Sequence, residues 1–399
     1  MRDEMKKVPR LRFRGFSEEW EQCKLGDLGS VAMNKRIFKE QTSESGDIPF
    51  YKIGTFGATA DAFISRELFE TYKKKYPYPK IGDLLISASG SIGRVVEYKG
   101  NDEYFQDSNI VWLKHDDRIN NLFLKQFYSI VKWHGLEGST IKRLYNKNIL
   151  ETTIHLPVFD EQEKIGTLFK QLDDIITLHQ RKLEQLKELK KAYLQLTFPK
   201  KDETVPRVRF ADFEDDWQLC KLGDVVEIFD GTHQTPRYTD SGVKFVSVEN
   251  IATLETKKYI THEAYEKEYS KKRAKKGDIL MTRIGDIGTM KVIETDEPLA
   301  YYVTLALLKA KETNPYFLSF IISSPEIQRN IWKRTLHIAF PKKINLGEIN
   351  QVEMKITIFE EQDKIGDLFT NLDDAIILNQ NKLNQLKSLK KSYLQNMFI

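Results

Sequence analysis

The chain has 399 residues, of which 40% are hydrophobic and 30% charged, a composition typical of a globular protein with two or three domains. Its apolar runs, such as residues 317–322, are far shorter than the roughly 18 residues of a membrane span, and the charged residues 1–4 lead into no apolar signal core. We therefore expect a cytoplasmic protein with no membrane association. The net charge is only +4, so nucleic-acid binding would have to come from local basic patches.

A segment near the N-terminus occurs twice. Residues 8–27 read VPRLRFRGFSEEWEQCKLGD, and residues 205–224 read VPRVRFADFEDDWQLCKLGD. Cys23 and Cys220 occupy matching places, and we interpret them as small packed residues rather than as a disulfide or a metal pair. The protein is therefore predicted to contain two tandem copies of one unit.

Each copy continues with a variable region, 28–155 or 225–355, in which sequence identity mostly disappears. Both regions show the same succession of a glycine turn and strand, a hairpin with two glycines at its tip, another strand, and a helical pattern. These elements fall at 46–53, 80–98, 110–114 and 121–134 in the first copy, and at 242–248, 276–293, 305–309 and 315–334 in the second. Each variable region is predicted to be α+β with a curved sheet.

A long helix is predicted after each variable region. Segments 160–198 and 360–398 are identical at 25 of 39 positions. Apolar residues recur at three- and four-residue steps, which predicts a helix about 55 Å long that ends before Pro199. The predicted stripe contains Leu168, Leu172, Ile175, Leu186, Leu189, Tyr193 and Leu196, flanked by Ile176 and Leu183. Because such a helix is not stable alone, we expect its stripe to pack against the second copy.

Polar residues also repeat within these helices. His179 and Asn379 share one heptad position, where a polar residue commonly fixes the register; the alternative is that they lie at the edge of the stripe. Residues 173–174 and 373–374 are Asp-Asp pairs. Adjacent helical side chains point about 100° apart, so we interpret these pairs as a solvated face or a partner contact rather than as an acid/base dyad.

The sequence contains no recognisable catalytic motif. It has no Gly-x-x-x-x-Gly-Lys-Ser/Thr loop, no Cys-x-x-Cys pair, no His-Glu-x-x-His pair and no Gly-x-Ser-x-Gly elbow, and its seven histidines have no ligand spacing. A self-contained DNA methyltransferase or nuclease would need a cofactor-binding glycine loop or metal-binding carboxylates. We therefore predict a non-catalytic chain that binds no metal or cofactor itself.

Candidate DNA-binding residues occur around both hairpins. Aromatic and basic residues alternate just before each hairpin, a pattern suited to phosphate contacts and stacking, although a solvated basic face is the alternative. An arginine on or beside each tip could bind a guanine edge or form a surface salt bridge. The loop 229–238 could contact bases or be a polar turn. The candidates are Lys73, Lys74, Lys75, Tyr76, Ser89, Ser91, Arg94, Thr232, His233, Gln234, Thr235, Lys271, Lys272, Arg273, Arg283 and Asp286.

Together these features resemble the specificity subunit of type I restriction-modification enzymes, over essentially the whole chain. The resemblance rests on the tandem variable regions, on the Glu-Gln-x-Lys-Ile-Gly opening of each long helix, and on recurrent target-recognition motifs. The motifs lie at 161–166, 361–366, 230–238, 241–251 and 276–280.

The sequence departs from the family pattern in two places. The first helix follows Leu156-Pro157 but the second follows Ile356-Thr357, so the two helices could start at different angles. Copy one also lacks the Gly-Thr-His loop of copy two, so the two domains should recognise different bases.

The resemblance implies two pseudo-symmetric target-recognition domains, 1–155 and 201–355, separated by conserved helices at 156–200 and 356–399. The helices would form an antiparallel intramolecular coiled coil that sets the spacing between the half-sites of a bipartite, asymmetric target in double-stranded DNA.

The resemblance also implies partner subunits. Two modification subunits would methylate adenine with S-adenosylmethionine, and two restriction subunits would use ATP and Mg. A coiled-coil scaffold that binds only proteins is the alternative function, but it leaves the paired basic hairpins unexplained.

Overall fold

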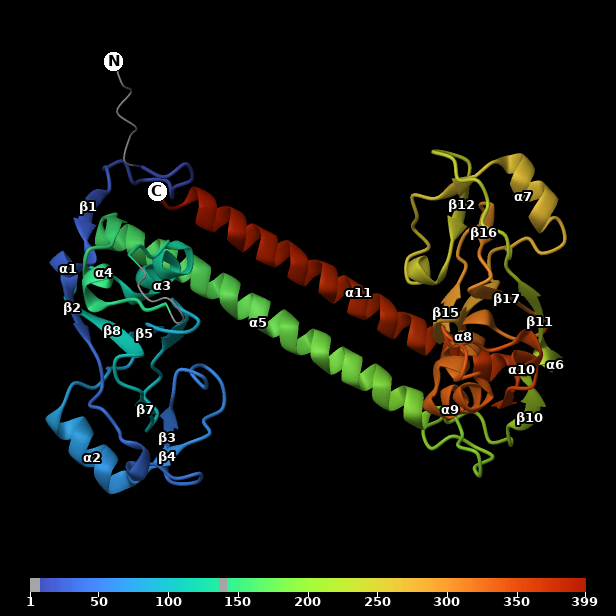
Figure 1. The fold of residues 1–399 in the computed structure, drawn as a ribbon, viewed down its shortest axis with the longest axis horizontal. Coiled ribbons are helices and arrows are strands. Elements are labelled where there is room, and N and C mark those ends of the chain that lie inside the picture. The colour runs from blue at the N-terminus through green and yellow to red at the C-terminus, as the bar shows by residue number, and fades with distance from the viewer. Residues whose placement is uncertain (1–7, 136–141) are drawn as a thin grey trace, which may run out of the picture. The chain divides into compact units, whose positions relative to one another are not determined.

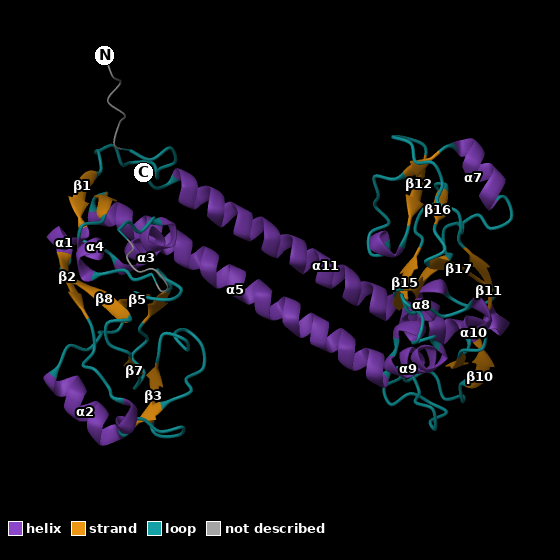
Figure 2. Cartoon of the chain, in the orientation of Figure 1, coloured by secondary structure: helices purple, strands orange, loops and turns teal. Residues whose placement is uncertain are grey.

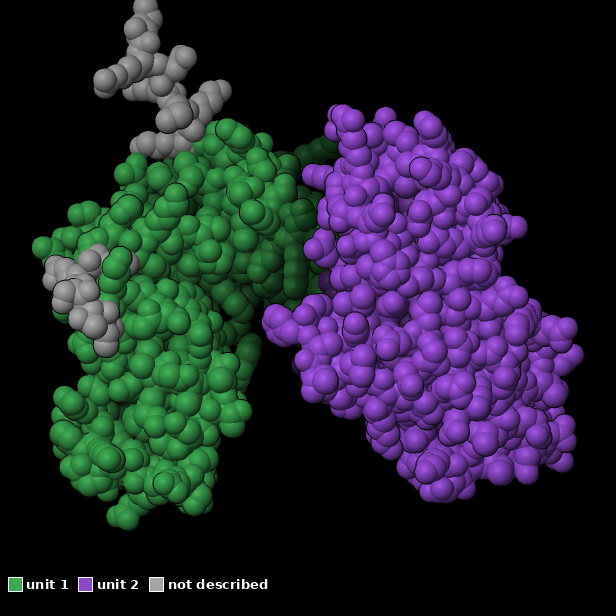
Figure 3. Space-filling view, turned by 45° about the vertical axis from the view of Figure 1, so that its right-hand side comes forward, with its two compact units in different colours: residues 1–180, 382–399 green, residues 181–381 purple. Residues whose placement is uncertain are grey.

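The computed structural model describes residues 8–135 and 142–399, which form two compact units (Figures 1 and 3). Unit 1 comprises Met1–Gln180 and Lys382–Ile399, and unit 2 comprises Arg181–Asn381. The 38-residue helices α5 (Phe159–Leu196) and α11 (Phe359–Asn396) each pass from one unit into the other. Each unit therefore contains one variable region and one part of each long helix.

Unit 1 combines small sheets with short helices (Figure 2). Its described strands form an antiparallel pair, a four-stranded sheet and a three-stranded sheet. In sheet order these are β1 (Glu21–Lys24) and β9 (Thr153–Leu156); β2 (Gly29–Ala32), β8 (Ile110–His115), β5 (Leu84–Ser87) and β6 (Val95–Glu97); and β4 (Phe63–Ile64), β3 (Ile48–Tyr51) and β7 (Tyr104–Phe105). The helices are α1 (Leu25–Leu28), η1 (Lys39–Gln41), α2 (Arg66–Lys75), α3 (Asn121–Ile130) and α4 (Asn146–Leu150).

Unit 2 has the same sheet topology. Its strands in sheet order are β10 (Gln218–Lys221) and β18 (Glu353–Ile356); β11 (Val226–Asp230), β17 (Leu305–Ala310), β14 (Ile279–Ile284) and β15 (Asp286–Val292); and β13 (Tyr259–Ile260), β12 (Val243–Val246) and β16 (Leu299–Tyr301). Its helices are α6 (Leu222–Val225), η2 (Val248–Asn250), α7 (His262–Tyr269), α8 (Pro315–Ser323), α9 (Pro325–Arg334) and α10 (Leu346–Asn350). The predicted α+β class is thereby confirmed.

Both predicted hairpins form: β5 pairs antiparallel with β6, and β14 with β15. The helix predicted over 315–334 is instead two helices, because Ser324 has extended backbone and Pro325 begins α9. A proline has no N–H to continue the hydrogen bonding of α8, but it fits the first turn of a new helix.

An aromatic cluster anchors a long helix in each unit. In unit 1, Phe398, just after α11, stacks on Phe123 with ring centroids 5.1 Å apart. In unit 2, Phe198, just after α5, stacks on Phe369 at 5.7 Å. The rings of Trp20 and Trp217 pack edge-on against these phenylalanines. Because all of these side chains are buried, the helix ends belong to the cores of the units.

The repeated opening of each long helix is a structural attachment. Glu161 is fully buried and accepts two hydrogen bonds from the Arg12 guanidinium, at 2.7 and 2.8 Å. Arg209 and Glu361 form the same pair in unit 2 at the same distances. In each unit, hydrogen bonding to the glutamate raises the pKa of the arginine. Such bidentate pairs fix the orientation of a helix as well as its position.

The glycine of the same motif allows close packing. A Cβ at Gly166 would lie 2.5 Å from the Cβ of Leu122, so only glycine lets α5 approach the start of α3 this closely. The glutamine of the motif adds a polar contact, because Gln162 Oε1 accepts a hydrogen bond from the backbone N–H of Asn120 at 2.9 Å.

The two helices start in matching ways despite the different preceding residues. They begin at Phe159 and Phe359. The side chain of Gln162 donates to the carbonyl of Pro157 at 3.0 Å, and that of Gln362 donates to the carbonyl of Thr357 at 2.7 Å. These contacts use only backbone oxygens of residues 157 and 357, so a proline and a threonine both allow them, although Thr357 also donates its hydroxyl to Glu361.

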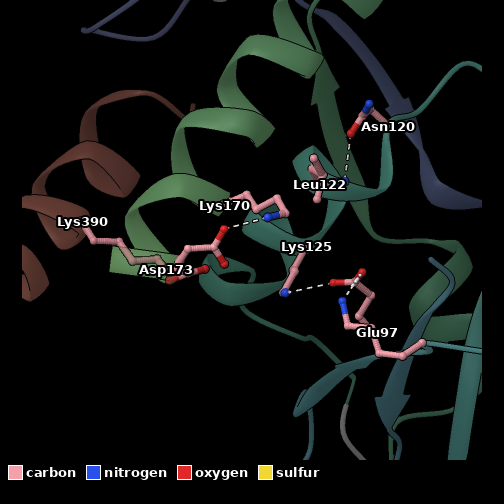
Figure 4. Close-up of polar contacts among 9 residues, drawn as sticks. Glu97, Asn120, Leu122, Lys125, Lys170, Asp173 and Lys390 are labelled. Carbon is pink, nitrogen blue, oxygen red and sulfur yellow. Dashed lines mark hydrogen bonds and ion pairs between the residues drawn. The ribbon is translucent and has the colours of Figure 1, made fainter. Parts of the chain in front are cut away.

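Within each unit the parts of α5 and α11 pack antiparallel. In unit 1, Lys390 Nζ lies 2.5 Å from Asp173 Oδ1 (Figure 4). In unit 2, Lys190 Nζ lies 2.5 Å from Asp373 Oδ1. The first carboxylate of each Asp-Asp pair is therefore a contact between helices, whereas Asp174 pairs with Lys170 on the surface of α5.

The predicted apolar stripe was partly wrong, because some of its residues do not lie on the buried face of α5. The buried positions of α5 include Phe169, Leu172, Ile176 and Leu183, but Ile175 and Leu189 are 41% and 42% exposed. The sequence pattern is wider than one seam, and residues at its edge remain in solvent within their own unit.

Candidate nucleic-acid interface

The hairpin of unit 2 lies at one edge of its four-stranded sheet. Its pairing shifts between Met281 and Arg283, which is a β-bulge of the kind that redirects a side chain. Thr282 Oγ1 accepts a hydrogen bond from the backbone N–H of Thr289 at 2.9 Å and lies 3.4 Å from Asp286 Oδ2. These contacts fix the tip, where Asp286 is exposed.

Arg283 is directed into the unit and is only 6% exposed. Its Nη2 donates to Asp230 Oδ2 at 3.3 Å, and the same oxygen lies 2.7 Å from His233 Nε2. Among the described residues, neither Arg283 Nε nor Asp230 Oδ1 has a hydrogen-bond partner. The structure therefore joins three polar side chains of two candidate segments and leaves unused hydrogen-bonding capacity in the cluster.

The loop after β11 is held by its backbone while its side chains face solvent. A Cβ at Gly231 would overlap the carbonyl oxygen of Tyr302, so a side chain here would prevent this close approach. Thr232 is buried; its N–H donates to the carbonyl of Tyr301 at 3.1 Å, and its carbonyl accepts from Val303 at 3.0 Å. The exposed candidates that follow are His233, Gln234 and Thr235. Base contact by these three side chains stays a prediction, and a polar turn without base contact stays the alternative.

The unit 1 hairpin presents different groups. Ser89 is buried and donates to Asn109 Oδ1 at 2.7 Å, whereas Ser91 is exposed. Arg94 is exposed, and its Nη1 donates to the carbonyl of Phe56 at 2.7 Å. The two hairpin arginines thus differ in environment, since Arg94 lies at the surface and Arg283 does not.

The returning strand of this hairpin is tied to α3 (Figure 4). Lys125 Nζ lies 3.3 Å from Glu97 Oε2, and Lys99 Nζ lies 2.6 Å from Glu97 Oε1. Burial alone would raise the pKa of Glu97, but the two lysines outweigh it and lower that pKa below its usual value. The hairpin is therefore connected through α3 to the start of α5.

The basic segments lie beside the other sheet of each unit. Lys73, Lys74 and Lys75 form the last turn of α2, and Lys35 and Lys75 lie over the ring of Tyr76. Lys73 pairs with Asp102 at 3.4 Å. Hydrogen bonding from Arg66 is the main cause of the lowered pKa of Asp102. Lys74 and Lys75 are exposed at the end of the helix.

In unit 2 the matching basic segment follows α7. Lys272 pairs with Glu268 at 3.0 Å, Arg273 pairs with Glu266, and Lys271 is exposed. The Tyr301 hydroxyl donates to the carbonyl of Lys272 at 2.9 Å. Because burial raises the pKa of Tyr301, this hydroxyl keeps its proton and orders the segment.

One exposed feature was missed from the sequence. The loop 336–343 presents Ile338 and Phe340 to solvent beside the hairpin tip of unit 2. The apolar residues between Leu336 and Pro341, followed by two lysines, were the available signal. Such a short run cannot be separated from a buried strand by pattern alone.

The part of the chain that the structure describes contains no group of three or more His, Cys, Asp or Glu residues arranged to hold a metal ion. No helix within residues 8–135 and 142–399 has both the length and the apolar composition needed to cross a membrane.

Comparison with known proteins identifies the family. The chain matches the Type I restriction modification DNA specificity domain twice, over residues 17–188 and 214–388. It therefore belongs to the type I restriction-modification specificity family, whose subunits are non-catalytic.

Two relatives, one similar over part of the chain and one over nearly all of it, are both described as type I restriction enzyme specificity subunits. Over 152 residues the chain is 55% identical to a putative type I restriction enzyme specificity subunit of Haemophilus influenzae, a match that spans 38% of this chain and 40% of the relative. Over 403 residues it is 23% identical to a type I restriction enzyme specificity subunit of Methanocaldococcus jannaschii, covering 94% and 91% of the two chains.

A solved structure confirms the fold. The crystal structure of a type I restriction-modification S subunit from M. genitalium aligns with a TM-score of 0.64 and 15% identity, over 98% of this chain and 99% of that one. At this identity the likeness concerns the fold alone.

Proposed function

We propose that this chain recognises a bipartite, asymmetric target in double-stranded DNA. One half-site would be bound by the target-recognition domain 1–155 and the other by the domain 201–355. The conserved helices, 156–200 and 356–399, would set the spacer between them. The chain would recruit two adenine-methyltransferase subunits and two restriction subunits.

The observation that carries this proposal is a shared framework with different exposed groups. Both units attach their helices through the same Arg–Glu pair and place a glycine-tipped hairpin in a matching sheet. At the surface, unit 1 offers Ser91 and Arg94, whereas unit 2 offers His233 and Gln234. Different donors and acceptors on one framework are what recognition of two unlike half-sites requires.

Exposed apolar side chains on the long helices support partner binding. In unit 1, Leu178 is 64% exposed and Leu389 is 40% exposed. In unit 2, Leu378 is 70% exposed and Ile377 is 56% exposed. Large apolar residues grouped on a helix surface mark protein contacts. We propose that the modification subunits cover them.

The proposed cofactors belong to the partners. S-adenosylmethionine would be bound by the modification subunits, and ATP and Mg by the restriction subunits. Adenine methylation requires the base to leave the duplex, so the specificity chain must bind DNA while the modification subunit distorts it. The cell compartment we propose is the cytoplasm, where chromosomal DNA is accessible to the complex.

Sequencing of methylated adenines tests this function. Cells that carry this chain with its modification subunit should show one bipartite, asymmetric methylated motif, and cells lacking the chain should not. Exchanging residues 201–355 for the domain of a relative should change one half of the motif and leave the other half intact. A chain that binds partner proteins but produces no chain-dependent motif would be a protein scaffold instead.

A further inference from the structure

A loop of unit 2 exposes two large apolar side chains without cover from its own unit. Between α9 and α10, Ile338 is 99% exposed and Phe340 is fully exposed. Exposed apolar residues are common singly, but a phenylalanine and an isoleucine two residues apart at the top of one loop gain by burial in a partner.

The two ends of this loop are held by backbone hydrogen bonds. The N–H of Leu336 donates to the carbonyl of Lys343 at 2.8 Å, which closes the loop on itself. The N–H of Gly285 donates to the carbonyl of Lys342 at 2.9 Å, and that of Ile344 donates to the carbonyl of Arg283 at 2.9 Å. The loop is therefore an extension of the hairpin tip that carries Arg283 and positions the Asp230–His233 pair.

The loop and the end of α9 also carry cationic side chains. Lys342 Nζ lies over the ring of Trp332, 4.6 Å from its centroid, and Trp332 itself is 53% exposed. Lys333, in the last turn of α9, and Lys343, the last residue of the loop, are exposed. The acidic side chain nearest in the chain to the hairpin tip is Asp286, which lies 3.4 Å from Thr282 Oγ1.

An apolar loop that also carries lysines, and that is hydrogen-bonded to the candidate base-reading hairpin, matches the chemistry of duplex DNA. Lysines bind the phosphates, and an apolar side chain can enter between stacked bases. We propose that Phe340, supported by Ile338, inserts into the base stack within the half-site bound by unit 2 and opens one base step. This inference rests on the proposed function and adds a distortion of the DNA by the specificity chain itself.

The proposal concerns unit 2 only. In the first copy the corresponding stretch, 136–141, reads Leu-Glu-Gly-Ser-Thr-Ile and contains no aromatic residue. It lies outside the described residues. The side-chain insertion should therefore be confined to one half of the target, in addition to the base flipping by the modification subunits.

The test uses the full chain assembled with its modification subunit. The DNA duplexes contain the target motif identified by methylation sequencing, in unmethylated form. In each duplex, 2-aminopurine replaces one base, at successive positions of each half-site. Besides the position of the base flipped for methylation, the wild-type complex should raise 2-aminopurine fluorescence at one further step, which lies in the unit 2 half-site. Phe340→Ala should abolish that rise and weaken specific binding about tenfold, while binding to random DNA changes less than about twofold. Phe340→Leu should retain part of the signal, and Leu219→Ala, a change at a 67% exposed site on β10, should leave it unaltered.

Three outcomes would overturn the insertion. Phe340→Ala with unchanged fluorescence and affinity would show that the side chain does not enter the stack. Loss of assembly with the modification subunit in the absence of DNA would make the loop a protein-docking site. Phe340-dependent binding to anionic lipid vesicles, with unchanged DNA signals, would make it a membrane contact. A chain that produces no methylated motif at all would instead refute the proposed function.

Discussion

At the scale of single residues, the two hairpin arginines have different environments and make different contacts. Arg94 is exposed and donates to a backbone carbonyl, whereas Arg283 is 6% exposed and donates to Asp230. A buried guanidinium next to a carboxylate fixes neighbouring groups, here His233 through Asp230. We therefore propose that Arg283 acts by positioning the loop.

Replacing Arg283 by alanine should affect both stability and recognition. The change leaves the carboxylate of Asp230, 24% exposed, without its cation, which should cost about 1–3 kcal/mol of unfolding free energy. Loss of His233 positioning should reduce discrimination at one base pair of the unit 2 half-site by about 1–3 kcal/mol. Urea unfolding and competition binding with singly substituted targets measure the two effects.

Arg94→Ala is the matched control in unit 1. Its side chain is exposed and makes one hydrogen bond, to the carbonyl of Phe56, so its removal should lower the unfolding free energy by about 1 kcal/mol or less. Equal losses of affinity for target and random DNA in Arg283→Ala would mean that this arginine supports phosphate binding rather than base recognition.

At the scale of elements, local patterns predicted the long helices and the hairpins. The three- and four-residue apolar steps of 161–198 and the paired glycines of 80–98 depend only on neighbouring residues. The helix break at Ser324-Pro325 is also local, because a proline cannot continue the hydrogen bonding of the helix before it. The candidate polar residues of 230–235 were identified by the same local reasoning.

Contacts between distant segments could not be predicted in this way. Arg12 and Glu161 are 149 residues apart, and the sequence around either residue does not indicate that the other is its partner. The burial of Arg283 depends on a bulge and on the position of β11, and the projection of Phe340 depends on hydrogen bonds to β14. These features arise only when the strands are assembled.

Replacing Glu361 by alanine should detach α11 from its domain. Glu361 is fully buried, and its removal leaves the Arg209 guanidinium, 12% exposed, with no carboxylate. Breaking one side of such a pair should lower the unfolding free energy by about 3–5 kcal/mol. Hydrogen exchange should increase first in residues 359–366 and in the segment 205–210.

A surface pair on the same turn provides the control. Lys364 pairs with Asp212 at 2.7 Å, but these side chains are 45% and 72% exposed. Lys364→Ala should therefore cost at most about 1 kcal/mol and leave hydrogen exchange of residues 359–366 unchanged. A cost for Glu361→Ala as small as that of Lys364→Ala would contradict the proposed role of the buried pair in attaching the helix.

At the scale of the whole molecule, the boundaries of the units fall within the long helices. The chain leaves unit 1 after Gln180 in α5 and returns to it at Lys382 in α11. Each unit contains its own helix-to-helix ion pair, Asp173–Lys390 or Lys190–Asp373. Residues can therefore be inserted at these two boundaries without altering either ion pair between the helices.

Insertion of seven helix-forming residues after Gln180 and seven after Asn381 tests whether the helices set the spacer. Seven residues add about 10.5 Å and restore the helical face to within about 20°. Because base pairs rise about 3.4 Å each, the preferred spacer should lengthen by about three base pairs. Three base pairs also rotate the DNA by about 100°, so affinity for the best new target should fall.

Selection of methylated sites from a library of targets with varied spacers measures the preferred spacer length. An insertion after Gln180 alone should abolish the preference by putting the two helices out of register, and an unchanged spacer in the double insertion would show that the helices do not determine it.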